Sequence, residues 1–169
     1  MSRTSANRRS RNEYVLVTAA YNEEAYIENL IRSVTSQTVL PIKWIIVSDG
    51  STDGTDAIVQ RQAEKFKFIR LHRITEDHPR NFAAQVHAIN AGLALLKDLE
   101  CNLIGNLDAD VSFEPNYFSE LLEKFNQDPE LGLAGGSIQE QVGSVFLPRK
   151  GNIPTSVPHA VQCFRRESL

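Results

Sequence analysis

Short apolar runs recur along this chain, and the spacing of hydrophobic residues changes between them. Tyr14–Ala20, 44–47 and Leu103–Leu107 are continuous apolar runs, as expected of strands that are buried on both faces. Residues 68–72 and 131–138 show a weaker pattern of the same kind. These runs predict the strands of one buried sheet.

Between the runs, the hydrophobic positions follow the 3.6-residue period of a helix. A helix is predicted over Thr55–Lys65, because the dense turn at 49–54 ends in residues that can cap it. Three further helical faces are marked by Ile27, Leu30, Ile31 and Val34; by Phe82, Val86, Ile89, Leu93 and Leu96; and, after a helix start at Pro115, by Phe118, Leu121, Leu122 and Phe125.

The alternation of strands and helices predicts an α/β fold with a mostly parallel central sheet flanked by helices. A length of 169 residues suits a single domain with a substantial core. In such a sheet the connections are right-handed, and ligands bind outside the carboxyl ends of the strands.

Charge is distributed unevenly along the chain. The net charge is −3, yet four arginines and no acidic residue lie in the first twelve positions. Residues 1–13 are therefore expected to be a disordered basic tail, and 14–169 the folded domain. The acidic body argues against a nucleic-acid partner. The tail could contact an anionic membrane surface, although a solvated tail is the simpler interpretation.

The remaining composition points to a reducing compartment. Cys101 and Cys163 are far apart in sequence and lack metal-ligand spacing, so they are expected to be reduced thiols of a cytoplasmic protein. No apolar run approaches the length of a membrane span, and the N-terminus has no apolar signal segment.

Polar residues follow three of the predicted strands. Tyr21 and Glu23 come after the first strand, Asp49 after the second, and Asp108 and Asp110 after the run at Leu103–Leu107. The carboxyl ends of parallel strands meet at one end of a sheet, so these residues are expected to converge there. An Asp-x-Asp pair suits a hard divalent cation that holds phosphate oxygens, although turn-favouring Asp residues alone also fit the pattern.

Two common phosphate-binding motifs are missing from the sequence. No G-x-G-x-x-G follows the first strand, and no Walker A motif occurs anywhere in the chain. A cradle made only of backbone amides is therefore not expected, and a metal ion that carries the phosphate charge becomes the better hypothesis.

Three segments resemble the family 2 glycosyltransferases of the GT-A fold. They are VTAAYNEE at 17–24, WIIVSDGSTDGT at 44–55 and NLDAD at 106–110. Shorter matches, NAG at 90–92 and FRRE at 164–167, extend the resemblance over nearly all of 14–169. The resemblance implies one Rossmann-like GT-A domain that transfers a sugar from a nucleotide-sugar donor, commonly a UDP-sugar, with inversion.

The resemblance also implies roles for individual residues in nucleotide-sugar binding. Asp49 would bind the base, and Tyr21 and Glu23 would flank the base or ribose. Asp108 would face the ribose or the water shell of a Mg²⁺ or Mn²⁺ ion, and Asp110 would ligate that ion directly. Ala19 and Ala109 would complete the donor-binding set. A divalent ion suits this chemistry because the diphosphate leaving group gains negative charge.

The family normally supplies an acidic general base beyond the Phe-Arg-Arg segment, and this chain stops at Leu169. We therefore expect 14–169 to be the donor-binding part, truncated before the acceptor and general-base region. Such a part could be inactive alone. The acceptor would be a glycan, a lipid or a polyprenyl phosphate. Many family members carry membrane helices, so a place at the cytoplasmic face of a membrane is compatible with the resemblance.

Two alternatives remain open at the level of sequence. In a haloacid-dehalogenase-type phosphatase, Asp108 would be the nucleophile and Asp110 the acid/base. That motif normally follows the first strand, however, and leaves Tyr21 and Asp49 unexplained. A non-catalytic nucleotide-binding module would also fit. Arg165 and Arg166 are expected on a solvated face, with contact to a diphosphate as the alternative.

Overall fold

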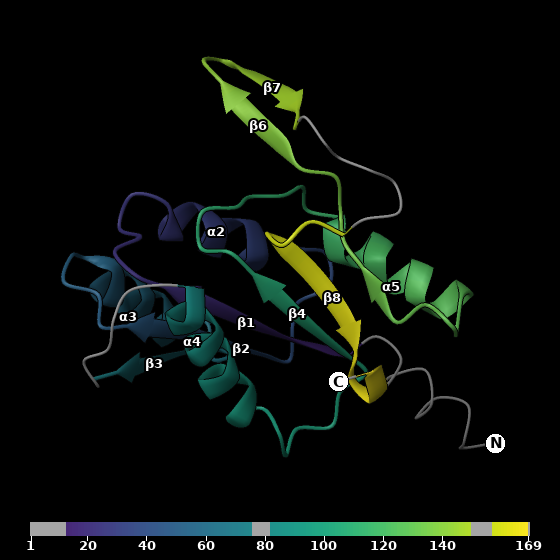
Figure 1. Cartoon of the computed structure of the whole chain (residues 1–169), viewed down its shortest axis with the longest axis horizontal. Helices are drawn as coiled ribbons and strands as arrows, with labels where there is room; N and C mark the ends of the chain where they lie inside the picture. The colour runs from purple at the N-terminus through teal and green to yellow at the C-terminus, as the bar shows by residue number, and fades with distance from the viewer. Residues whose placement is uncertain (1–12, 76–81, 150–156, 169) are drawn as a thin grey trace.

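A six-stranded mixed sheet forms the centre of the computed structural model, which describes residues 13–75, 82–149 and 157–168 (Figure 1). The strand order is β3-β2-β1-β4-β8-β5. The parallel strands are β1 (Tyr14–Ala20), β2 (Lys43–Asp49), β3 (Ile69–Ile74) and β4 (Leu103–Leu107). Strand β8 (Val161–Arg165) runs antiparallel to β4 and to the short β5 (Leu133–Ala134). The predicted α/β fold with a mostly parallel sheet is confirmed.

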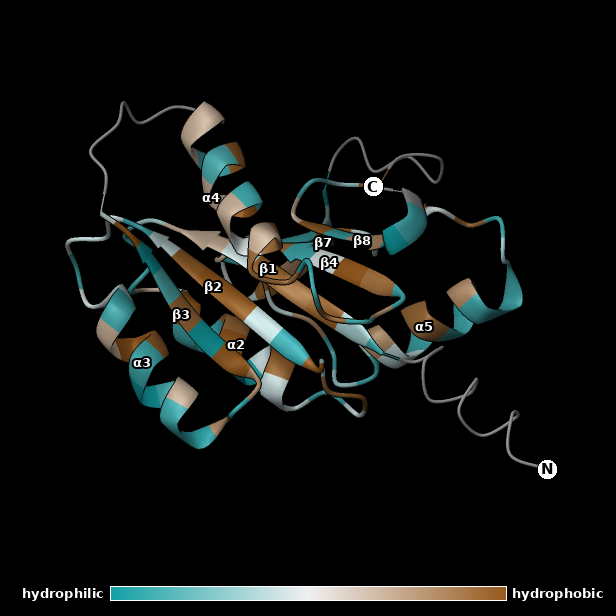
Figure 2. Cartoon of the chain, turned by 90° about the horizontal axis from the view of Figure 1, so that it is seen from below, coloured by the Kyte–Doolittle hydropathy of each residue, from teal (hydrophilic) through white to brown (hydrophobic). Residues whose placement is uncertain are grey.

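Helices cover both faces of the sheet (Figure 2). On one face, α2 (Ile27–Thr35), α3 (Thr55–Lys65) and α5 (Tyr117–Gln127) pack against Leu16 and Ile46 in the larger core cluster. On the other face, α4 (Phe82–Ala94) packs against a smaller cluster. Successive side chains of a strand point to opposite faces of the sheet. Because the parallel strands are continuous apolar runs, they supply apolar side chains to both clusters.

The face that α4 presents to the sheet differs from the prediction. The sequence pattern placed Val86 on the buried face, but its side chain is 39% exposed, whereas Ala84 and Ala88 are buried. Gly92 continues this stripe of small residues, and a Cβ there would lie 2.7 Å from Cγ1 of Val17. Small side chains therefore let α4 approach the sheet closely, a contact that a search for large apolar residues overlooks.

The chain after α5 also departs from the prediction. Residues 131–138 do not form one strand, and only β5 is extended there. A Cβ at Gly135 would lie 2.4 Å from the carbonyl oxygen of Val161. The backbone of β8 therefore lies too close to position 135 for a larger residue to be accommodated there. The hydrophobic pattern did not predict β8 or the projecting hairpin of β6 (Gln139–Val142) and β7 (Val145–Pro148) (Figure 1).

The other boundaries lie close to those predicted. Strand β3 begins one residue later than predicted and ends two later, and α5 begins at Tyr117 rather than at Pro115. The basic tail lies almost wholly outside the described residues, which begin at Glu13. Within the described part of the chain, no helix is both long and apolar enough to cross a membrane.

Candidate functional site

The candidate site lies where the carboxyl ends of β1, β2 and β4 meet, which we call the carboxyl end of the sheet. Strand β1 pairs with β2 on one side and with β4 on the other. The chain first builds outward from β1 through β2 to β3 and then crosses to the opposite side with β4. Such a reversal of strand order is where ligands bind in open α/β sheets, because the loops on its two sides diverge.

The loops after β1 and β2 are joined by hydrogen bonds in both directions. Backbone N–H groups of the first loop donate to side chains of the second: Asn22 to Ser51 Oγ (3.2 Å), Glu23 to Thr55 Oγ1 (2.8 Å) and Glu24 to Asp53 Oδ2 (3.0 Å). Backbone N–H groups of the second loop donate in return: Thr52 to Asn22 Oδ1 (2.8 Å) and Gly54 to Glu24 Oε2 (2.9 Å). We call these five hydrogen bonds the loop clasp.

Backbone geometry explains the residue types of the clasp. Asn22 has a φ of +55°, the left-handed region that Asn tolerates better than most residues. A Cβ at Gly54 would lie 2.8 Å from the carboxyl carbon of Glu24, so a larger residue there would displace that carboxylate. Thr55 is fully buried at the start of α3 and also donates its hydroxyl to Asp53 Oδ1 at 2.6 Å. These contacts therefore hold the loops after β1 and β2 in one conformation.

Carboxylates gather beside the clasp. Partial burial raises the pKa of Glu23, and the charges of Asp110, Asp53 and Asp108 raise it further. Burial likewise raises the pKa of Asp108, with Asp110 adding to the effect and His159 opposing it. Burial and like charges both disfavour the ionised forms, so a cation would relieve the repulsion.

The remaining predicted site residues differ in exposure. Asp49 is 5% exposed at the end of β2, whereas Tyr21 is 41% exposed after β1. Asp110 is exposed and Ala19 is half-buried. Ala109 is 4% exposed and belongs to the larger core cluster, so it can serve a ligand only through its backbone.

The donor set fits a hard divalent ion held only in part by protein. Carboxylate oxygens are ligands that Mg²⁺ and Mn²⁺ accept, and here they lie where negative charge is already in excess. Among the residues that the structure describes, no group of three His, Cys, Asp or Glu side chains is close enough to enclose a metal ion. One or two carboxylates, completed by water and phosphate oxygens, match the way Mg²⁺ usually binds.

Gln85 and His159 lie near Asp108, and the sequence pattern indicated neither of them. Gln85 of α4 donates from Nε2 to Asp108 Oδ1 at 3.3 Å. The backbone N–H of Asp108 donates to the carbonyl oxygen of Ala160 at 2.9 Å, which brings the segment before β8, with His159, to the same end of the sheet. Recognising β8 as an antiparallel neighbour of β4 would have indicated His159; no sequence signal indicated Gln85.

Arg165 and Arg166 lie at the opposite end of the sheet, which we call the amino end, so neither sequence interpretation of them holds. Arg165 donates from Nε to the carbonyl oxygen of Leu131 at 2.8 Å and from Nη2 to that of Asp128 at 2.8 Å. It also reaches the carbonyl of Phe125 near the C-terminus of α5. These contacts tie β8 to the end of that helix and to the chain that follows it.

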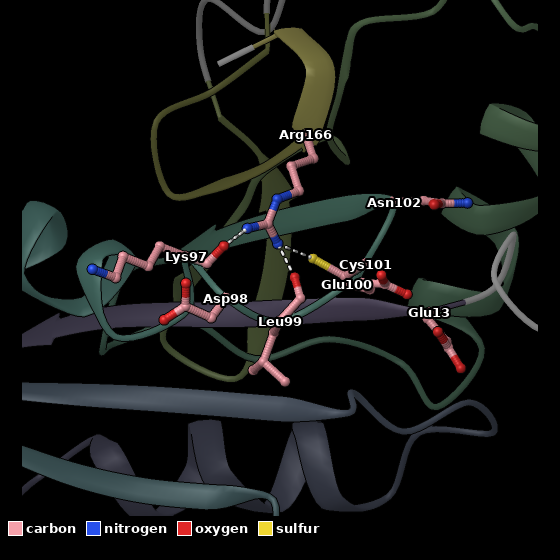
Figure 3. A pocket seen from close by; sticks show the side chains of 8 residues that line it. All are labelled: Glu13, Lys97, Asp98, Leu99, Glu100, Cys101, Asn102 and Arg166. Atoms are coloured by element: carbon pink, nitrogen blue, oxygen red, sulfur yellow. Dashed lines mark hydrogen bonds between the residues drawn. The ribbon is translucent and has the colours of Figure 1, made fainter.

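Arg166 makes the same kind of contact with the chain that follows α4 (Figure 3). Its guanidinium donates to the carbonyl oxygen of Leu96 at 3.3 Å and to the carbonyls of Lys97 and Leu99. It also lies 3.1 Å from Cys101 Sγ. A cavity of about 430 Å³ opens beside it, lined mainly by residues 97–102. The guanidinium of Arg166 donates to three backbone carbonyls, which indicates a structural role.

Comparison with known proteins gives a family. The family model described as Glycosyl transferase family 2 matches residues 15–167. An uncharacterized glycosyltransferase of Nostoc sp., alr2836, is 27% identical over 175 residues, which cover 91% of this chain and 51% of that protein. The poly-beta-1,6-N-acetyl-D-glucosamine synthase of Staphylococcus aureus is 29% identical over 119 residues, covering 70% of this chain and 27% of that enzyme. The chain thus spans about a quarter to a half of the length of these curated relatives.

Solved structures show the same fold. The mannosyltransferase PcManGT from Pyrobaculum calidifontis, in complex with GDP-Man and Mn²⁺, has a TM-score of 0.63 at 20% identity, over 91% of this chain and 44% of that one. S. aureus TarS (residues 1–349) in complex with UDP has a TM-score of 0.54 at 20% identity, over 68% and 32%. These likenesses confirm the GT-A fold, and the family match favours the glycosyltransferase hypothesis over the phosphatase.

Proposed function

The chain belongs to glycosyl transferase family 2, and from that premise we propose that it binds a nucleotide-sugar donor, with a divalent metal ion, at the carboxyl end of its sheet. The observation that carries the proposal is the convergence there of the clasped loops after β1 and β2 with the carboxylates after β4. The hydrogen-bonded loops and the cluster of carboxylates, which favours a bound cation, lie at the same end of the sheet. Both are suited to recognition of a charged nucleotide.

The nucleoside half of the donor is assigned to the loops after β1 and β2. The carboxylate of Asp49, nearly buried at the end of β2, would accept hydrogen bonds from the base, since an ionised Asp only accepts. Tyr21 and Glu23 would flank the base or ribose, and the backbone at Ala19 and Ala109 would complete the wall. A UDP-sugar is the first candidate, because TarS has been solved with UDP and UDP-GlcNAc; PcManGT, solved with GDP-Man, makes a guanosine donor the second.

The diphosphate half is assigned to the loop after β4. Asp110, the exposed member of the pair, would ligate Mg²⁺ or Mn²⁺ directly, and Asp108 would face the ribose or the water shell of the ion. When bound, the ion would supply Lewis-acid stabilisation of the departing diphosphate. Gln85 would orient the Asp108 carboxylate through its 3.3 Å hydrogen bond.

Transfer to an acceptor with inversion belongs to the same proposal. An inverting displacement needs a base that takes the proton of the acceptor hydroxyl. None of the described residues has a geometry that assigns it this role, and we propose that the base comes from the family's acceptor region beyond Leu169. A glycan, a lipid or a polyprenyl phosphate would serve as acceptor, at the cytoplasmic face of a membrane if the acceptor is lipid-linked.

Titration calorimetry with UDP and GDP, each with and without Mn²⁺, tests the donor proposal. We expect binding that requires Mn²⁺ and prefers UDP, and we expect Asp49→Ala to weaken it, because base recognition is lost while the metal ligands remain. Asp98→Asn, at the amino end of the sheet, is the matched control. Binding that ignores Mn²⁺, or release of phosphate from a simple phosphate ester, would argue against the proposal.

A further inference from the structure

Arg73 links three elements behind the candidate nucleoside site. It lies on β3, opposite Ser48 of β2 in the parallel register, one residue before the level of Asp49. Its Nη2 donates to the carbonyl oxygen of Ser51 at 3.0 Å, and its Nη1 forms an ion pair with Asp56 in the first turn of α3. One guanidinium therefore connects β3, the loop after β2 and the start of α3.

The contacts of Arg73 complement the loop clasp. Ser51 accepts from Asn22 through its hydroxyl and from Arg73 through its carbonyl, so it is held from both sides. The clasp fixes the loop after β2 against the loop after β1, and Arg73 fixes it against β3. Asp49 lies two residues before Ser51, where the strand passes into this loop.

Asp56 makes the arginine hard to replace. Its side chain is 22% exposed, and its Oδ1 is buried with no hydrogen-bond partner among the described residues. Removing Arg73 would leave a partly buried carboxylate without its counter-charge, next to a loop whose carbonyl has lost its donor. An unpaired carboxylate or carbonyl in such a place costs more free energy than the lost contact contributed. We therefore expect the loop to move until both groups are hydrated.

We propose that Arg73 is a positioning residue for donor binding: it holds the loop after β2 so that Asp49 and the clasp present one preformed surface to the nucleoside. This inference rests on the proposed function. It extends that function to a residue beyond the strand-end motifs, one that acts on the nucleotide through Ser51. Preformed loops bind more tightly because less conformational freedom is lost on binding.

The test compares UDP dissociation constants, measured with saturating Mn²⁺ well below each variant's melting temperature. For Arg73→Ala we expect the Kd to rise about tenfold, as expected for the loss of a hydrogen bond from a charged group. Arg73→Lys should recover part of the loss, because one ammonium can reach only one of the two acceptors. Arg70→Ala, an exposed arginine on the same strand, should leave the Kd unchanged.

Amide hydrogen exchange gives an independent readout on the apo protein. Arg73→Ala should speed exchange at Thr52 and Gly54, while the amides of α5 keep their wild-type rates. A lowered melting temperature with an unchanged Kd would overturn the inference, since it would mark Arg73 as merely structural. If wild type binds UDP and Arg73→Ala binds equally well, the inference fails and the donor proposal stands; if wild type binds neither UDP nor GDP, both fail.

Discussion

The two ends of the sheet use charged side chains in opposite ways. At the amino end, the guanidinium groups of Arg165 and Arg166 donate to backbone carbonyls. These hydrogen bonds hold the chain that follows α5 and the chain that follows α4. At the carboxyl end, Glu23 and Asp108 have raised pKa values because they are partly buried and lie near other carboxylates. Satisfied charges stabilise a fold, whereas charges held in mutual repulsion are typical of binding sites.

Cavity volume alone does not identify the proposed donor site. The cavity of about 430 Å³ lies at the amino end, beside Arg166, whose guanidinium donates to backbone carbonyls. The carboxyl end holds the strand reversal, the clasp and the carboxylates, and the cavity beside Gln85 and His159 is smaller, about 220 Å³. Topology and charge therefore favour the carboxyl end, and not the cavity at the amino end, as the proposed donor site.

The largest expected effect is loss of metal-dependent binding when Asp110 becomes Asn. The substitution keeps the shape but removes the charge that holds the ion, so the affinity for UDP in Mn²⁺ should fall about 100-fold, or roughly 3 kcal/mol. Calorimetry measures this directly. Asp98→Asn, which removes the same charge at the amino end, should bind like wild type; equal losses in both variants would erase the distinction between the two ends.

Arg166→Met should show the opposite profile. Several backbone carbonyls lose their donor, so the free energy of unfolding should drop by about 2 kcal/mol, measured by urea denaturation. The UDP affinity of the folded protein should stay within about twofold of wild type. A stable variant with weakened UDP binding would instead make the amino end part of the functional site.

The pH dependence of stability should report the carboxyl end. Because the folded pKa values of Glu23 and Asp108 are raised, the folded state binds more protons than the unfolded state above about pH 4, where free carboxylates ionise. Their contribution to stability is therefore lost as pH rises from that value through the folded pKa values. Both groups are partly solvated, so the loss should be below about 1 kcal/mol.

Thermal melting of the metal-free protein between pH 4 and 7, with Asp108→Asn as comparison, checks this dependence. The variant should lose less stability across the window than wild type. Saturating Mn²⁺ and UDP should also flatten the wild-type curve, since a cation offsets the repulsion. A wild-type stability that rises relative to the variant between these pH values would contradict the charge assignment.

The smallest effect concerns Gln85. Its hydrogen bond to the Asp108 carboxylate is long and exposed to water, so Gln85→Leu should weaken UDP binding only about twofold to threefold, with no change in Mn²⁺ dependence. Val86→Ala, at the neighbouring exposed position on α4, is the control. A loss as large as that of Asp110→Asn would mean that Gln85 itself contacts the ligand.

The sequence predicted the parts of the molecule in which local pattern and burial agree. Strands β1 and β4 and helix α3 have the predicted bounds. A strand buried on both faces leaves a continuous apolar run, and the turn rich in Asp, Gly, Ser and Thr at 49–54 marks where α3 begins. Strand β8 escaped prediction because Val161–Arg165 mixes polar and apolar residues at the border of the parallel part of the sheet. Its burial depends on long-range pairing with β4, which leaves little local signal.

The candidate site shows the same division. Strand-end positions predicted where Asp49, Asp108 and Asp110 lie, because parallel strands bring their carboxyl ends together. The clasp, the Arg73 bridge and the Gln85 contact depend on side chains that meet from separate elements, and no spacing in one sequence reveals such pairs. The roles of Arg165 and Arg166 were wrong for a related reason, since a charged pair near a chain end resembles a solvated surface until its carbonyl partners are seen.

The most direct test of the central claim is to locate the metal. Crystals soaked with Mn²⁺ and UDP, with data collected at a wavelength where manganese scatters anomalously, would show the ion without any assumption about activity. We predict an anomalous peak in coordinating contact with the Asp110 carboxylate, with the diphosphate beside it and the uracil near Asp49. A manganese peak away from Asp108 and Asp110, or UDP bound beside Arg166 at the amino end, would contradict the account.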